Sequence, residues 1–98
     1  MSSMIEGLIK AAFENKASDI FLSEGRVARM KVNGQLMVAG DDPIEKDDII
    51  SFWKRCGADP EYDGDRDSSY VAHNGVRFRV NLHRHLGKLG AVLRQINT

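Results

Sequence analysis

Residues 76–83, VRFRVNLH, alternate strictly between apolar and polar side chains. Successive side chains of a β-strand point to opposite faces of a sheet, so the alternation predicts a strand over 76–85 with one buried and one solvent-facing side. The buried side would carry Val76, Phe78, Val80 and Leu82. The other side would carry Arg77, Arg79, Asn81, His83 and His85. This row of cations and hydrogen-bond donors suits an anionic ligand or an acidic partner surface better than apolar packing.

The length and composition favour one small cytoplasmic domain. A chain of 98 residues has room for a single modest core. No apolar run approaches the roughly 18 residues of a membrane span, and Glu6 and Lys10 interrupt the segment that would otherwise resemble a signal peptide. With Cys56 as the only cysteine, no intramolecular disulfide can form, so we expect a reducing compartment.

The net charge of zero conceals an uneven distribution. Residues 41–67 contain ten acidic and four basic side chains, whereas residues 76–98 contain five basic side chains and no acidic one. A neutral chain argues against a nucleic-acid-binding protein, whose whole domain is usually basic. The basic segment therefore predicts a local anionic ligand rather than a nucleic-acid partner.

The first half of the chain predicts one helix and three strands. Apolar residues recur with helical spacing and predict an amphipathic helix over about 4–15. A short strand is expected at 20–22. Asn33-Gly34 predicts a tight hairpin turn between strands at 27–32 and 36–38.

The second half predicts one helix and an antiparallel meander. Pro43 is expected to open a helix that runs to about Cys56. Residues 58–67, ADPEYDGDRD, are expected to form a polar, acidic loop. Strands are then expected at 69–72, 76–85 and 91–96, separated by turns at 73–75 and 87–90. Because connections this short require antiparallel pairing, the sequence predicts an α+β fold with an antiparallel sheet and helices packed on one face.

Three local patterns imitate binding sites, and each lacks a required group. GKLG at 87–90 lacks the spacing of a phosphate-binding P-loop. Residues 59–70 resemble a calcium loop but lack the bidentate glutamate at its end. His83 and His85, with His73 across the turn, could chelate a metal, but no cysteine or carboxylate completes the set, so surface histidines are favoured and no metal is assigned.

No catalytic residue can be proposed from the spacing of nucleophiles, histidines and carboxylates. Cys56 lies on the inward face of the second helix and is interpreted as a core side chain rather than a nucleophile. Asp19 lies between the first helix and the first strand, where a turn or capping role is expected.

Three stretches nevertheless resemble one protein family in the right order along the chain: KASDIFLSEG at 16–25, MKVNGQL at 30–36 and GVRFRVNLHRHLGKLGAVLRQI at 75–96. They are similar to the amino-terminal, PAS-like domain of the PilT-like type IV pilus retraction ATPases, in the type II/IV secretion ATPase superfamily. The most specific part is RFRVN followed by LR at the family's spacing.

The resemblance implies that residues 1–98 are a single PAS-like domain of a hexameric bacterial motor ATPase. The RecA-like ATPase domain, which carries the Walker motifs, would lie outside this chain, so the chain alone is not expected to be an enzyme. In this family, arginines of the amino-terminal domain reach the nucleotide phosphates when the cleft between the two domains closes. By motif position these are Arg79 and Arg94, with Arg77 as a helper.

The resemblance also implies cofactors, partners and a location. ATP and Mg²⁺ would bind the full-length parent and not this fragment. The partners would be the parent's own ATPase domain, neighbouring subunits of the homo-hexamer and the inner-membrane platform proteins of the pilus. The parent would act in twitching motility from the cytoplasmic side of the inner membrane, at the pilus base.

Two simpler interpretations remain open. Arg77 and Arg79 could be the solvated face of a strand, paired with cross-strand carboxylates for a few tenths of a kcal/mol each. Arg94 fits that interpretation less well, because it interrupts an apolar strand. At the level of function, the alternative is a free-standing PAS-like domain that senses a ligand or acts as a protein-interaction adaptor.

Overall fold

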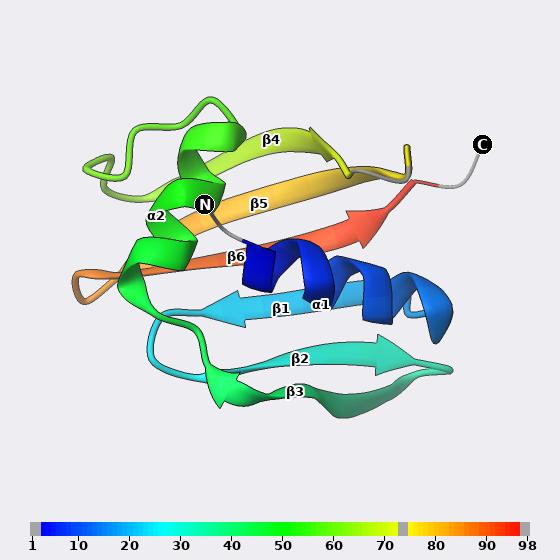
Figure 1. The fold of residues 1–98 in the computed structure, drawn as a ribbon. Coiled ribbons are helices and arrows are strands. Elements are labelled where there is room, and N and C mark those ends of the chain that lie inside the picture. Colours follow the sequence, from blue (N-terminus) through cyan, green and yellow to red (C-terminus); the bar gives the residue numbers. More distant parts are fainter. Residues whose placement is uncertain (1–2, 73–74, 97–98) are drawn as a thin grey trace.

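The computed structural model describes residues 3–72 and 75–96, which form two helices and six strands (Figure 1). The helices are α1 (Ser3–Glu14) and α2 (Lys46–Arg55). The strands are β1 (Asp19–Ser23), β2 (Val27–Val32), β3 (Gln35–Pro43), β4 (Asp65–Val71), β5 (Arg77–His85) and β6 (Lys88–Gln95). They form one sheet in the order β3-β2-β1-β6-β5-β4, with all neighbouring strands antiparallel. The predicted α+β fold is confirmed.

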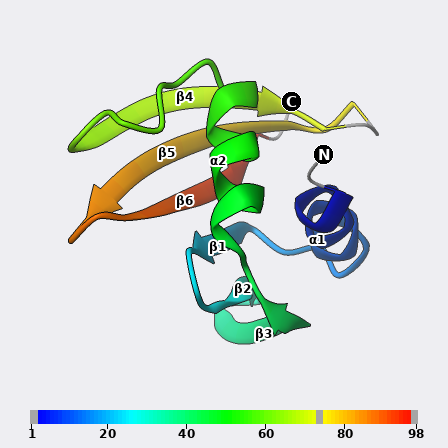
Figure 2. The ribbon, with the colours of Figure 1, turned by 60° about the vertical axis from the view of Figure 1, so that its left-hand side comes forward.

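Both helices pack on the same face of the sheet, as two views of the ribbon show (Figures 1 and 2). The apolar side chains of the strands alternate onto this face, where Phe78, Val80 and Leu82 of β5 are at most 3% exposed. Helix α2 contributes Ile49, Phe52 and Trp53, all fully buried. The opposite face, called the open face below, is covered by neither of the two described helices.

Helix α2 begins later than predicted. Pro43 does not open it but ends β3, where it pairs with Val27 of β2. Proline lacks an N–H donor and is tolerated in a strand at the edge of a sheet, which is where β3 lies. Glu45 is the N-cap residue of α2, and Gly57, at a φ of 80°, follows its end as predicted.

The last three strands also differ from their predicted bounds. The acidic segment was expected to be a loop, but β4 begins at Asp65 within it, because charged side chains are well accommodated on an edge strand that faces solvent. The turn between β5 and β6 is shorter than predicted. It consists of Leu86 and Gly87, both at positive φ as in the two-residue turns that join antiparallel strands, so β6 already begins at Lys88.

The turn predicted at 73–75 includes residues 73 and 74, which lie outside the described residues.

A polar cluster ties the two helices to the sheet edge. The Tyr70 hydroxyl of β4 donates a hydrogen bond to the Glu6 carboxylate of α1. The Arg55 guanidinium of α2 lies 3.3 Å from the same hydroxyl oxygen and 3.7 Å from Glu6 Oε2. The Tyr70 ring also packs on Phe52, with 5.0 Å between ring centroids. The hydroxyl therefore connects α1, α2 and β4 in a largely buried setting.

Replacing Tyr70 by Phe removes the hydroxyl and leaves the ring. Because the hydrogen bond has a charged acceptor, we expect the free energy of unfolding to fall by about 1–2 kcal/mol, measured by urea denaturation. Tyr62→Phe is the matched control, since Tyr62 is 43% exposed and should change stability by less than about 0.5 kcal/mol. Equal losses in the two variants would contradict a stabilising role for the cluster.

Candidate functional site

The open face carries the residues that the alternation of β5 assigned to it. Arg77, Arg79 and His85 are exposed, and Asn81 and His83 are half-buried, between apolar side chains that point to the helices. The predicted arrangement of this strand is confirmed. Since neither described helix covers this face, its exposed side chains can meet a ligand or another domain.

Strand pairing places four polar residues in a row across the open face. Arg79 of β5 lies directly opposite Arg94 of β6, Arg94 lies opposite Asp19 of β1, and Asp19 lies opposite Lys31 of β2. Residues that are directly opposite in an antiparallel pair have Cα atoms about 4.5–5.5 Å apart. Arg77 lies two residues before Arg79 on the same face. The structure thus brings together the three arginines that the sequence singled out.

Arg94 is held in place by a buried carboxylate. Its Nε donates a hydrogen bond to Asp19 Oδ1 at 2.9 Å. Asp19 is 6% exposed, whereas the Arg94 side chain is 72% exposed. The Ser18 hydroxyl donates to the second carboxylate oxygen at 3.1 Å. The ion pair therefore fixes the Nε side of the guanidinium while most of the side chain faces solvent.

Asp19 does not have the turn or capping role expected from the sequence. It is the first residue of β1 and forms cross-strand pairs on both sides. Sequence reasoning missed its contact with Arg94 because the two residues are 75 positions apart. The sequence held one signal. If residues 19–23 form a strand, parity puts Asp19 and Phe21 on the face away from the apolar Ile20 and Leu22, so Asp19 points away from the core.

Arg79 lacks the carboxylate that the solvated-strand interpretation requires. Its cross-strand neighbours are Ser69 on β4 and Arg94 on β6, and Arg77 lies opposite Val71. Within residues 3–72 and 75–96, neither Arg77 nor Arg79 forms an ion pair. Like charges directly opposite each other on a sheet are destabilising. Asp19 offsets the charge of Arg94, so the charge that an anion bound between the two arginines would balance is that of Arg79.

A shallow pocket of about 280 Å³ lies beside the two arginines. Arg79 and Arg94 line it, together with Asn81 and Asp67. The Asn81 amide donates a hydrogen bond to Asp67 Oδ1 at 3.2 Å, so this carboxylate already has a partner other than the arginines. The arrangement offers two guanidinium groups to one anion at a solvent-accessible place.

The histidines of β5 do not form a comparable site. His83 lies opposite Gly90, and a Cβ atom added at Gly90 would overlap its imidazole, so the ring covers the glycine. His73, the third ligand considered, lies outside the described residues. In the described ranges, no three His, Cys, Asp or Glu side chains gather where they could hold a metal ion.

Cys56 follows α2 and is half-buried beside the core. Burial raises the pKa of its thiol to about 12, because a thiolate would lose its hydration there. The thiol is therefore neutral at physiological pH, which supports the interpretation as a packing residue rather than a nucleophile.

Comparison with solved structures identifies proteins with this fold. The Legionella pneumophila ATPase DotB matches 98% of the chain with a TM-score of 0.77 and 21% identity. The pilus retraction motor PilT with bound ADP matches 96% with a TM-score of 0.67 and 22% identity. The chain shares the fold of part of each ATPase. The DotB ATPase of Yersinia pseudotuberculosis is similar too, with a TM-score of 0.72 and 16% identity over 99% of the chain.

The chain spans about 30% of the length of these ATPases. No family model matches the sequence, and no curated protein does. Neither described helix has the length and apolar character needed to cross a membrane.

Replacing Asp19 by Asn removes the charge that holds Arg94. We expect the free energy of unfolding to fall by about 1–2 kcal/mol, and the Arg94 Nε–H to exchange faster with solvent in NMR spectra. Asp67→Asn is the matched control, because that exposed carboxylate bonds only to Asn81 among the described contacts. Unchanged exchange at Arg94 in Asp19→Asn would show that the ion pair does not restrain the guanidinium.

The raised pKa of Cys56 predicts slow alkylation. At pH 8 a thiol with a pKa of about 12 is about 10⁻⁴ thiolate, whereas an ordinary cysteine is about one quarter thiolate. We expect iodoacetamide to react at least about 100-fold more slowly with the native chain than with the chain in urea. Similar rates in both states would contradict a buried, neutral thiol.

Proposed function

We propose that this chain is the amino-terminal domain of a PilT-like secretion ATPase, in which Arg79 and Arg94 contact the nucleotide phosphates when the domain closes on its ATPase domain. The observation that carries the proposal is the direct cross-strand pairing of these arginines on an uncovered face, with no ion pair between Arg79 and a carboxylate among residues 3–72 and 75–96. The sequence motifs and the shared fold with DotB and PilT support it.

The chemistry of guanidinium groups suits this role. A guanidinium is planar, permanently charged and able to donate two parallel hydrogen bonds to phosphate oxygens. Asp19 would hold Arg94 on its Nε side and leave its remaining N–H groups for the phosphate. Arg77, on the same face, would add a third positive charge.

The parent's ATPase domain would supply the phosphate-binding loop and hold Mg²⁺, because this chain contains no GxxxxGK[ST] motif. Mg²⁺ would neutralise charge on the β- and γ-phosphates. The arginines of this chain would act only on closure, when they meet the charge that develops during phosphoryl transfer. The solved PilT motor holds ADP, which supports a nucleotide as the ligand of the parent.

Among the motors of this family, we propose that the parent of this chain drives pilus retraction. PilT is a pilus retraction motor, and the RFRVN and LR motifs of this chain resemble that group. The parent would then work in twitching motility as a homo-hexamer at the cytoplasmic side of the pilus base, against platform proteins of the inner membrane. Because DotB matches this chain with a TM-score of 0.77, against 0.67 for PilT, a related secretion motor is the nearest alternative.

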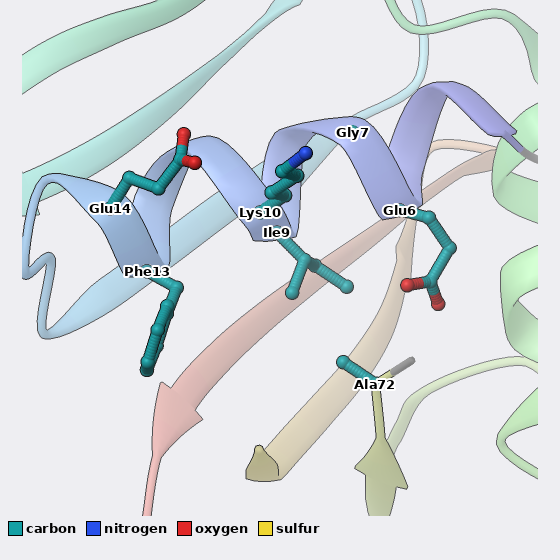
Figure 3. A pocket seen from close by; sticks show the side chains of 7 residues that line it. All are labelled: Glu6, Gly7, Ile9, Lys10, Phe13, Glu14 and Ala72. Carbon is teal, nitrogen blue, oxygen red and sulfur yellow. The ribbon is translucent and has the colours of Figure 1, made fainter. Parts of the chain in front are cut away.

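One observation favours a ligand-binding adaptor as the second candidate. An apolar surface pocket of about 440 Å³ lies between α1 and the end of β4. Ile9 and Phe13 extend from α1 toward Ala72 around it (Figure 3), and Phe13 is 45% exposed. A continuation of the reading frame into a GxxxxGK[ST] motif would favour the motor, and a stop at Thr98 would favour the adaptor.

The decisive experiment replaces the arginines in the full-length parent. Arg79→Ala and Arg94→Ala should each lower ATP turnover by at least about 10³-fold, because an arginine that meets the transition-state charge contributes about 10³–10⁵ in rate. Lys at either position should rescue poorly, since it keeps the charge and loses the planar fork. Turnover is measured at saturating ATP and Mg²⁺.

Arg29→Ala is the matched control. Arg29 is exposed on the open face but lies on β2, opposite Phe21, away from the paired arginines. Its loss should leave turnover within about twofold of the parent. If Arg79→Ala and Arg94→Ala behave like Arg29→Ala, the arginines are only a solvated strand face and the proposal fails.

A further inference from the structure

Strand β3 exposes three consecutive large apolar side chains at one edge of the sheet. Leu36, Met37 and Val38 are 54%, 46% and 65% exposed. Because successive strand residues point to opposite faces, Leu36 and Val38 lie on the open face and Met37 on the helix face. The edge is therefore apolar on both of its faces.

The opposite edge of the sheet begins with charged side chains, whereas the charges and the proline of β3 lie only at its far end, in residues 41–43, DDP. Strand β4 begins with Asp65, Arg66 and Asp67, all exposed, and charged side chains discourage pairing with another chain. The stretch 35–39 of β3, QLMVA, carries no charge and no proline. An exposed edge of this composition is a template for an added strand.

The part of β3 that can accept a strand is short and well defined. It follows the tight turn at Asn33-Gly34. It ends where the pairing with β2 jumps from Val38 to Pro43, a bulge that contains Gly40 at a φ of 90°. Bulges bend a strand and interrupt its pairing. An added strand would thus match about five residues, centred on Met37.

We propose that the β3 edge pairs with β3 of a second copy of this chain, antiparallel, about a two-fold axis at Met37. On the open face, Leu36 would then lie opposite Val38 of the second copy, and Val38 opposite its Leu36. On the helix face, the two Met37 side chains would meet. The apolar stretch complements itself in this register, which a two-fold interface requires.

The surrounding charges permit this pairing. The nearest cations of the open face, Arg29 and Lys31, lie on β2, one strand inward. Across the new interface the two β2 strands would be three strand spacings apart, about 14 Å. This distance exceeds the Debye length of about 8 Å at physiological ionic strength, so the repulsion between these cations is largely screened.

The size of the contact sets its strength. Five residues of one strand per copy bury far less than the roughly 800 Å² per partner of a standard interface. The dimer is therefore weak, with a dissociation constant on the order of 0.1–1 mM. Its contacts are apolar and backbone contacts, so added salt should not disrupt it.

Sedimentation velocity of the 98-residue chain, from about 10 μM to 2 mM, tests the association. The wild-type average mass should rise toward a dimer, equally in 0.1 M and 1 M NaCl. Val38→Lys should remain a monomer throughout. Val71→Lys is the matched control, because Val71 is 59% exposed on the open face of the other edge strand, and it should associate like the wild type.

A cysteine at the proposed axis tests the register and does not depend on the lysine variants. Directly opposite residues have Cβ atoms about 4.5–5.5 Å apart, so two copies of Met37→Cys should form an intermolecular disulfide at least about 10-fold faster than Val71→Cys at equal concentration. Cys56 should not interfere, because its thiol is neutral.

Three results would overturn the proposal: a wild-type chain that stays monomeric at 2 mM, a dimer that Val38→Lys leaves intact, or equal disulfide rates in the two cysteine variants. If the dimer dissociates in 1 M NaCl, charged surfaces rather than the β3 edges make the contact, and the proposal also fails. None of these results bears on the arginine proposal, which concerns other strands.

Discussion

The register between β5 and β6 determines the rest of this structure. The two-residue turn at Leu86-Gly87 fixes it, and side chains alternate with a period of two, so a slip by one residue would exchange the two faces. In the observed register, Val80 and Leu93 lie side by side under the helices, and Arg79 and Arg94 lie side by side on the open face. One pairing thus creates both the core of the sheet and the candidate phosphate site.

Two further contacts secure this register from opposite faces at Gly90. On the helix face, Trp53 Nε1 donates a buried hydrogen bond to the Gly90 carbonyl at 3.2 Å. On the open face, the His83 imidazole lies over the glycine, where a larger residue would displace it. The histidine therefore has a packing role in this strand, which accounts for one of the two imidazoles without any metal.

Much of the fold could be predicted from local patterns. The alternation of β5, the helical spacing of α1 and the Asn33-Gly34 turn each act over a few residues, and each led to a confirmed element. Apart from the early start of β6, the errors fall on the edge strands β3 and β4. The end of β3 (residues 41–43, DDP) and the start of β4 (residues 65–67, DRD) have the composition of a loop, and only pairing with a neighbour shows that they belong to strands.

The candidate site was predicted in part for the same reason. Parity placed Arg79 on the open face, and the short turn after His85 predicted that Arg94 would lie on the next strand. The contribution of Asp19 depends on the pairing of β1 with β6, which joins the beginning of the sheet to its end. No local pattern specifies that pairing, because it is selected by the packing of the whole sheet against its helices.

Phosphate contact by the arginines of the open face and pairing at the β3 edge can operate at the same time because of the strand order. Strands β2 and β1 separate the β3 edge from β6, which carries Arg94. In a dimer joined at β3, the two β6 strands would be seven strand spacings apart, about 34 Å. An anion bound between Arg79 and Arg94 of one copy would then be several Debye lengths from the same site in the other copy. Each site would bind its own phosphate without electrostatic influence from the site of the other copy. Edge pairing would therefore change the assembly of the domain and leave the affinity of Arg79 and Arg94 for phosphate unchanged.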